Sequence, residues 1–275
     1  MSAATAYEKA RAEGRAALVG YLPAGFPTVA GGIEAVRALA DSGVDLIEIG
    51  YPYSDPVMDG KVIQRATEVA LAGGVRGADV MRTVEAAAST GVPVLVMTYW
   101  NLVEHYAGGR GVARFAQDLV AAGGSGLITP DLIPDEAGPW LDVSDQHGLD
   151  RVFLVAPSST DARIASTVAA CRGFVYATSV MGVTGARETI SQGAPALVAR
   201  IRQALPAANP GLPVGVGLGV RDGDQAAAVG AYADGVIVGS ALVSCLAGTG
   251  LDTGLDALRR LVADLAAGVR RSSAA

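Results

Sequence analysis

The sequence has few side chains of the kinds that bind metals or form disulfides. Among its 275 residues there are two cysteines and two histidines. Cys171 and Cys245 are far apart and share no CxxC spacing, which favours two buried thiols in a reducing compartment over a disulfide. His105 and His147 have no second ligand at metal-binding spacing, so we expect both on the surface and no metal site.

Two further absences narrow the chemistry. Lys9 and Lys61 are the only lysines, and neither lies in an apolar, strand-like segment. This argues against a catalytic Schiff base inside the protein. No GxxxxGK[ST] run occurs, so a nucleoside triphosphate is disfavoured as a ligand.

The sequence also lacks the features of membrane and nucleic-acid-binding proteins. Hydrophobic residues make up 51% of the chain and the mean hydropathy is +0.37. However, no window approaches the roughly 18 uncharged apolar residues that cross a bilayer. Residues 1–15 mix charges with alanine and have no apolar signal-peptide core. The net charge is −6 and there is no basic run, which disfavours nucleic acid as a partner. We therefore expect a cytoplasmic protein.

Eight short apolar segments recur along the chain, as near-continuous runs and not as strict alternations. Such runs are typical of parallel strands that are covered on both faces. The segments are Ala17–Tyr21, Asp45–Gly50, Pro93–Thr98, Gly126–Thr129, Val152–Ala156, Phe174–Ser179, Val214–Leu218 and Gly235–Gly239. Amphipathic, alanine-rich stretches of helical length lie between them: Ile33–Ser42, Val80–Ser89, Val112–Ala122, Ala162–Cys171, Ala194–Ala204 and Gln225–Gly230.

This alternation predicts an α/β fold, a single (β/α)8 TIM barrel over residues 1–275 with extra helices. Residues 1–14 are expected to form an N-terminal helix or cap, and residues 268–275 a frayed tail. A doubly wound open sheet is the alternative. It would usually have a glycine-rich turn after the first strand, where this chain has the proline-containing run Pro23–Pro27.

Glycines stand at the C-terminal ends of the last two predicted strands. Gly217 and Gly219 end the seventh, and Gly239 ends the eighth before Ser240. Glycine amides can approach an anion closely, and Ser240 can add a hydroxyl at the start of a helix. Because many barrels bind phosphate after strands seven and eight, we predict a phosphate site here, with Gly185 adding an amide. The alternative is that these glycines only relieve crowding where strands bend.

Acidic residues stand at and after the second predicted strand. Glu48 lies inside an apolar run near the C-terminal end of that strand, where barrel enzymes place catalytic groups. Burial would raise its pKa towards neutrality, which suits a group that both takes and gives protons. In the long connection Tyr51–Gly60, Asp55 precedes a proline and is expected to shape the turn, whereas Asp59 could reach the strand mouth. The other long connection, Met181–Gly193, is the second candidate active-site loop.

Large side chains at strand ends could form the wall of a ligand site. Tyr176 lies inside the sixth strand, and Tyr21, Met97, Tyr99 and Leu154 lie at or near the ends of others. We predict that these five residues bind substrate. Plain core packing is the alternative.

The run EIGYPYSDPVMDG, Glu48–Gly60, closely resembles the signature of the tryptophan synthase α subunit family. Gly182–Gly185, Gly217–Gly219 and Gly239–Ser240 resemble the remaining motifs of that family, in the same order. The similarity extends over roughly residues 7–265. The resemblance implies a carbon–carbon lyase that cleaves indole-3-glycerol phosphate into indole and glyceraldehyde 3-phosphate in tryptophan biosynthesis.

The resemblance also implies roles for individual residues. Glu48 would act as the acid/base that helps to protonate indole C3 and then takes the glycerol hydroxyl proton. Asp59 would accept a hydrogen bond from the indole N–H. Tyr176 matches a substrate-contacting tyrosine, and Thr184 matches a loop residue that orders over Asp59 when the site closes.

The family's partner is a pyridoxal-phosphate-dependent β subunit, which receives indole. The resemblance thus implies an α2β2 assembly and no cofactor in this chain. Two alternatives remain: a lyase that releases indole without a partner, and a silent barrel that only activates the β subunit. The chain departs from the family at Lys61, where proline is usual, and in the slightly expanded stretch Ala107–Gly111.

Overall fold

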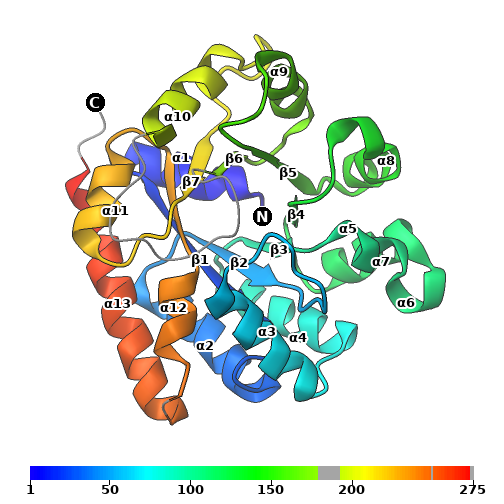
Figure 1. Cartoon of the computed structure of the whole chain (residues 1–275), viewed down its shortest axis with the longest axis vertical. Helices are drawn as coiled ribbons and strands as arrows, with labels where there is room; N and C mark the ends of the chain where they lie inside the picture. The colour runs from blue at the N-terminus through cyan, green and yellow to red at the C-terminus, as the bar shows by residue number, and fades with distance from the viewer. Residues whose placement is uncertain (179–192, 249, 273–275) are drawn as a thin grey trace.

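The computed structural model describes residues 1–178, 193–248 and 250–272 of the chain (Figure 1). Eight parallel strands form a closed barrel in sequence order, each paired with the next and β8 paired with β1. The predicted (β/α)8 barrel is therefore confirmed. The strands are β1 Ala17–Pro23, β2 Leu46–Gly50, β3 Val94–Met97, β4 Gly126–Thr129, β5 Asp150–Val155, β6 Val175–Thr178, β7 Val214–Gly217 and β8 Gly235–Val238.

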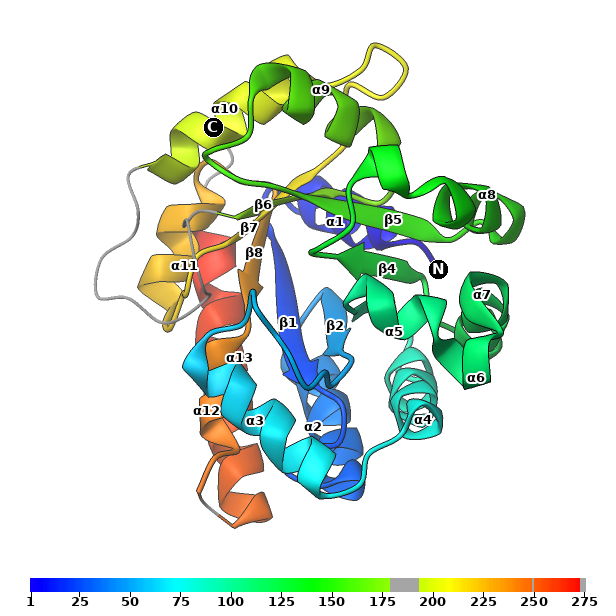
Figure 2. The same cartoon turned by 45° about the vertical axis from the view of Figure 1, so that its right-hand side comes forward.

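Helices surround the barrel (Figures 1 and 2). All six alanine-rich stretches are helical. The chain between β2 and β3 forms two helices, α3 and α4, in agreement with its length. The helices are α1 Ala3–Ala12, α2 Val29–Ser42, α3 Lys61–Ala72, α4 Gly77–Ala88, α5 Trp100–Glu104, α6 Tyr106–Gly109, α7 Gly111–Ala121, α8 Gly138–His147, α9 Asp161–Ala170, α10 Gly193–Gln203, α11 Gly223–Gly230, α12 Ser240–Cys245 and α13 Leu251–Arg271, with a short 3-10 turn at Pro134–Glu136.

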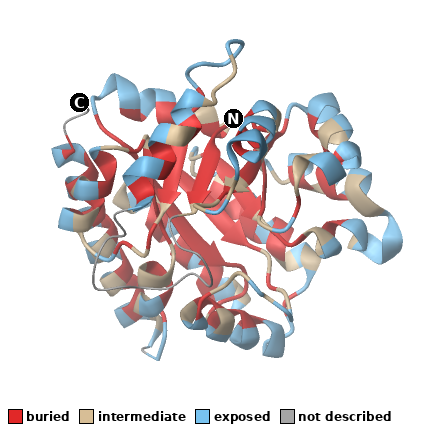
Figure 3. Ribbon diagram, turned by 45° about the horizontal axis from the view of Figure 1, so that its top comes forward, coloured by how far each residue is buried: buried red, intermediate tan, exposed pale blue. Residues whose placement is uncertain are grey.

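Burial follows from this layering. The strands are buried between the barrel interior on one side and the inner faces of the helices on the other (Figure 3). This explains why the strand sequences are mostly apolar, since most strand residues are covered on both faces. Among the described residues, no helix combines the length and the apolar character that crossing a membrane requires.

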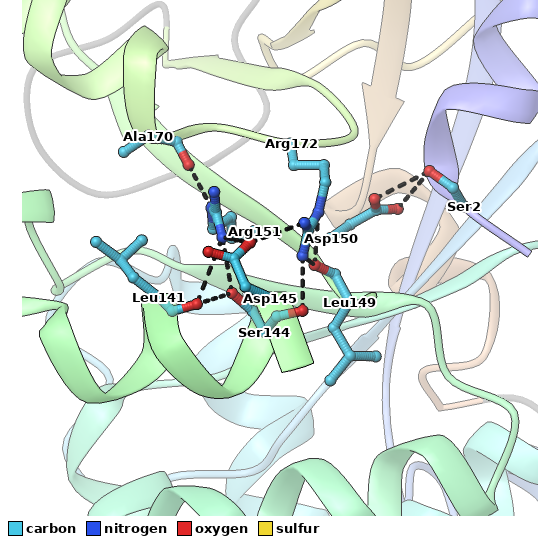
Figure 4. Close-up of polar contacts among 9 residues, drawn as sticks. All are labelled: Ser2, Leu141, Ser144, Asp145, Leu149, Asp150, Arg151, Ala170 and Arg172. Atoms are coloured by element: carbon cyan, nitrogen blue, oxygen red, sulfur yellow. Dashed lines mark hydrogen bonds and ion pairs between the residues drawn. The ribbon is translucent and has the colours of Figure 1, made fainter. Parts of the chain in front are cut away.

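Helix α1 closes the N-terminal end of the barrel. Its Tyr7 is buried in the interior cluster and its ring contacts Phe174, with centroids 5.2 Å apart. Asp150, at the start of β5, holds the beginning of α1: its carboxylate accepts hydrogen bonds from the Ala3 amide at 2.6 Å and the Ser2 hydroxyl at 2.9 Å (Figure 4). With this end closed, the interior is open to a ligand at the opposite end.

Polar contacts around Asp145 join α8 to the start of β5 and the segment before β6. Its carboxylate accepts hydrogen bonds from Arg151 at 2.6 Å and Arg172 at 2.9 Å (Figure 4). Asp145 is exposed, and the two guanidinium groups hold its pKa below the usual range. These pairs fix the outer helices to the strands at the end of the barrel away from the C-terminal strand ends.

The C-terminal segment differs from the expectation of a frayed tail from residue 268. Helix α13 continues to Arg271, Val269 is buried, and the Ser272 hydroxyl donates to the Val269 carbonyl at 2.6 Å. The prediction was wrong for residues 268–272 because the apolar face of this helix packs against α2 and α11. Residues 273–275 lie outside the described part of the chain.

Candidate active site

A cavity lies at the C-terminal ends of the barrel strands. Every strand, or the segment directly after it, contributes to the wall. The lining residues are Tyr21, Glu48, Met58, Asp59, Ile63, Met97, Pro130, Leu154, Tyr176, Thr178, Gly217, Leu218, Gly219, Ile237, Gly239 and Ser240. Both predicted carboxylates and all four predicted glycine and serine residues of strands seven and eight thus share one cavity.

Some predicted site residues lie elsewhere. Tyr99 does not line the cavity, and Thr184 and Gly185 lie outside the described residues. Sequence reasoning missed Met58, Ile63, Pro130, Thr178, Leu218 and Ile237. Two of them carried a signal, since Thr178 and Ile237 stand two positions from Tyr176 and Gly239, and alternate residues of a strand share a face.

Glu48 occupies the middle of β2 and faces the barrel interior. It is 1% exposed and pairs in register with Tyr21 of β1 and Leu95 of β3. Its Oε1 atom is buried without a hydrogen-bond partner among the described residues. Desolvation therefore disfavours the charged form and raises the pKa of Glu48 to about 8. At neutral pH this side chain holds a proton that it can donate.

Asp59 enters the cavity from the loop between β2 and α3. The loop turns because the Asp59 amide donates to the Pro56 carbonyl at 3.1 Å, and Gln64 Nε2 donates to the Asp59 carbonyl at 2.8 Å. Partial burial raises the pKa of Asp59 to about 6. Asp59 is therefore mostly ionised at neutral pH, while Glu48 is mostly protonated. Two carboxyl groups with such separate pKa values can act as an acid and as an ionic stabiliser in one site.

Two tyrosines, Tyr21 and Tyr176, form part of the cavity wall. The Tyr21 ring lies against Gly239 and its hydroxyl lies over Gly50, where a Cβ atom would overlap it. The Tyr176 hydroxyl lies over Gly217 in the same manner. Burial, followed by the nearby charges of Asp59 and Glu48, raises the pKa of both tyrosines well above its usual value. Both hydroxyls therefore stay protonated and able to donate hydrogen bonds.

The ends of β7 and β8 lie side by side across the cavity. Gly217 and Ile237 are register partners, and Gly219 follows in a left-handed conformation with φ 70°. Gly239 is the N-cap of α12, which begins at Ser240. None of the described residues that line the cavity is lysine or arginine. An anion bound here would therefore rely on backbone amides and the Ser240 hydroxyl.

The other candidate reactive groups lie away from the cavity. His105 and His147 are exposed. Burial raises the pKa of Cys171 to about 12, Cys245 is half-buried, and the two cysteines do not form a disulfide with each other. Within the described ranges, no group of three histidine, cysteine, aspartate or glutamate residues could hold a metal ion.

Residues 7–270 match the family described as "Tryptophan synthase alpha chain". The tryptophan synthase alpha chain of Salinispora arenicola is 64% identical over 266 residues, which are 96% of each chain. That of Acidothermus cellulolyticus is 62% identical over 269 residues, which are 98% of this chain and 97% of the relative.

Solved structures give the same result. A structure of Mycobacterium tuberculosis tryptophan synthase superimposes with a TM-score of 0.89 and 57% identity, covering 98% of both chains. The tryptophan synthase subunit alpha of Legionella pneumophila superimposes with a TM-score of 0.82 and 32% identity, again over 98% of both chains. The likeness therefore extends over nearly the whole chain.

Proposed function

The chain belongs to the tryptophan synthase α-chain family, and from this premise we propose that Glu48 and Asp59 carry out its cleavage of indole-3-glycerol phosphate. The products are indole and glyceraldehyde 3-phosphate. The observation that carries the proposal is the position of Glu48. Its carboxyl group is buried and protonated, and one of its oxygens has no hydrogen-bond partner among the described residues. It lies in the cavity that the glycines at the ends of β7 and β8 also line.

Glu48 supplies and recovers the proton in this mechanism. The protonated carboxyl group donates to C3 of the indole ring, and the ring becomes a cationic indolenine. The resulting carboxylate takes the proton of the glycerol hydroxyl next to the scissile bond. That C–C bond then breaks, its electron pair returns to the ring, and the hydroxyl carbon becomes the aldehyde. Glu48 ends the cycle protonated, so no other acid is consumed.

Asp59 stabilises the positive charge that develops on the ring. Its carboxylate accepts a hydrogen bond from the indole N–H, and this bond strengthens as C3 is protonated. Such a group lowers the barrier because it interacts more strongly with the transition state than with the substrate. Apolar side chains such as Met97 and Leu154, with the rings of Tyr21 and Tyr176, would contact the indole.

We propose that the phosphate binds at the ends of β7 and β8. Amides near Gly217, Gly219 and Gly239 and the Ser240 hydroxyl would hold its oxygens, and Gly185 stays a prediction for a further amide. Closure over Asp59 by Thr184 likewise stays a prediction, since both residues lie outside the described part of the chain.

The partner of this chain is a tryptophan synthase β subunit. We place the two subunits in an α2β2 assembly in the cytoplasm, with pyridoxal phosphate in the β subunit and no cofactor in this chain. Indole passes to that partner. The test is the rate of indole release from indole-3-glycerol phosphate with and without added β subunit. A large stimulation supports this proposal. Full activity alone indicates a self-sufficient lyase, and no activity in either case indicates a silent activator.

Asp59→Asn is expected to lower kcat about 10²- to 10³-fold, the effect of removing one positioned charge stabiliser. The rate of the wild-type enzyme should decrease on the acid side of its pH profile, at pH values under about 6, because Asp59 becomes protonated there. This acid limb should disappear in the variant, because asparagine does not titrate. The measurement is the pH profile of indole release. Asp55→Asn, in the exposed part of the same loop, is the matched control and should retain the limb.

Gly217→Ala is expected to weaken binding of a non-cleavable phosphorylated indole analogue about tenfold. The new Cβ would lie 2.5 Å from the Tyr176 hydroxyl, so this ring or the end of β7 must move within the site. A loss of about 1.4 kcal/mol in binding free energy is a factor of ten. Gly138→Ala is the control, since a Cβ there meets no atom within 4 Å. Calorimetry gives the dissociation constant of the analogue for each variant. If Gly217→Ala and Gly138→Ala bound the analogue equally well, the result would argue against the phosphate site.

A further inference from the structure

The loop that carries Asp59 is hydrogen-bonded to the end of β3 and to the residues that follow it. Its first residue, Tyr51, donates its amide to the Met97 carbonyl at 2.9 Å. Further along, the Met58 amide donates to the Tyr99 hydroxyl at 3.0 Å. Asn101 Nδ2 also donates to the Tyr53 hydroxyl at 3.4 Å. The contact at Met58 lies one residue before Asp59.

Tyr99 is held in place by burial and by packing of its ring. It is 6% exposed, and its ring packs on Tyr53 with centroids 5.1 Å apart. Tyr99 does not line the cavity, and its hydroxyl accepts the backbone amide of the loop. This differs from Tyr21 and Tyr176, whose side chains line the cavity. The ring of Tyr99 thus supports the middle of the loop, and its hydroxyl fixes the Val57–Met58 peptide, one residue before Asp59.

We infer that Tyr99 is a positioning residue, which acts on the reaction through the loop backbone and not by touching the substrate. The inference rests on the proposed role of Asp59. The carboxylate must meet the indole N–H within hydrogen-bond distance, and displacement by about 1 Å can lower a rate 10²-fold. Within the loop, Val57 and Asp59 donate their amides to the nearby carbonyls of Asp55 and Pro56. Those bonds set the turn, while the bond to Tyr99 sets where the turn lies.

The test is Tyr99→Phe in the complex with the β subunit. The ring remains, so packing on Tyr53 is kept, and only the acceptor for the Met58 amide is removed. We expect kcat for indole release to fall about 10-fold while KM stays within about twofold. Amide hydrogen exchange in a peptide covering residues 51–60 should become faster. The acid limb of the pH profile should also move below its wild-type position near pH 6, because a less fixed Asp59 is better solvated.

Tyr106→Phe is the matched control. It removes a hydroxyl that donates to Asp118 of α7 at 3.1 Å, while its ring stays packed on Phe115. It should change neither kcat nor exchange at residues 51–60. A Tyr99→Phe enzyme with normal kcat would overturn the inference. So would a raised KM with unchanged exchange, since that result indicates direct contact with the substrate.

These outcomes are separable from failure of the proposed function. If Asp59→Asn retained near-normal activity, the role of Asp59 would be lost whatever Tyr99→Phe did. If Asp59→Asn were impaired but Tyr99→Phe had normal kcat, only the positioning role would be lost. Hydrogen exchange reports on the loop in either case, because it does not depend on catalysis.

Discussion

Glu48→Gln is expected to lower kcat for indole release by about 10²- to 10⁴-fold, the usual contribution of a positioned general acid and base. Glutamine has nearly the shape of a protonated glutamate, so the cavity and the β7–β8 glycines should be unchanged. It can neither donate a proton to C3 nor accept one from the hydroxyl. Both halves of the proposed proton cycle are lost together.

Substrate binding separates this effect from a disturbed site. The dissociation constant of a phosphorylated indole analogue should stay close to that of the wild type, since the ring and phosphate contacts remain. Single-turnover measurements with enzyme in excess give the chemical rate directly. Glu68→Gln, on the exposed face of α3, is the matched control. A Glu48→Gln enzyme with a near-normal rate would remove Glu48 from the mechanism.

The inward position of Glu48 could be predicted because strand periodicity decides it. Leu46 and Glu48 are two residues apart, so both share the face that points into the barrel, and Leu46 does belong to the interior cluster. The glycines after β7 and β8 were predictable for a similar reason, since their strands fix where they lie. The local sequence pattern was sufficient to predict the position of a side chain wherever the strand that carries the residue determines that position.

The contact made by Tyr99 could not be predicted from the local sequence pattern. Tyr99 follows β3 by two residues, so its ring could have faced either the cavity or the neighbouring loop. Its hydroxyl binds Met58, which is 41 residues away in the chain, and no local pattern predicts such a contact. The C-terminal end of α13 is a second example. Chain ends fray by default, but Val269 and Ser272 are held by packing on distant helices.

The stability of the protein should depend on pH through Glu48. In the unfolded chain a glutamate has a pKa near 4.5, whereas burial raises the pKa of Glu48 to about 8 in the folded protein. Between these values the folded state holds a proton that the unfolded state has lost. The free energy of unfolding attributable to this group therefore falls as pH rises, by about 1.4 kcal/mol per pH unit. The sum is at most about 5 kcal/mol, reached above pH 8.

Glu48→Gln removes this dependence, because glutamine stays neutral in both states. The test is urea unfolding of both proteins at pH 5.5 and pH 8.5. The unfolding free energy of the variant minus that of the wild type should be several kcal/mol larger at pH 8.5 than at pH 5.5. Glu68→Gln should show no such divergence, since Glu68 is exposed. A difference that stayed constant or shrank with pH would mean that Glu48 is already ionised in the folded protein. In that case it could not donate the proton to indole C3, so the same substitution tests the cause of the catalytic loss. A gain in stability together with a loss of activity is the result expected when a buried acid is retained for its chemistry.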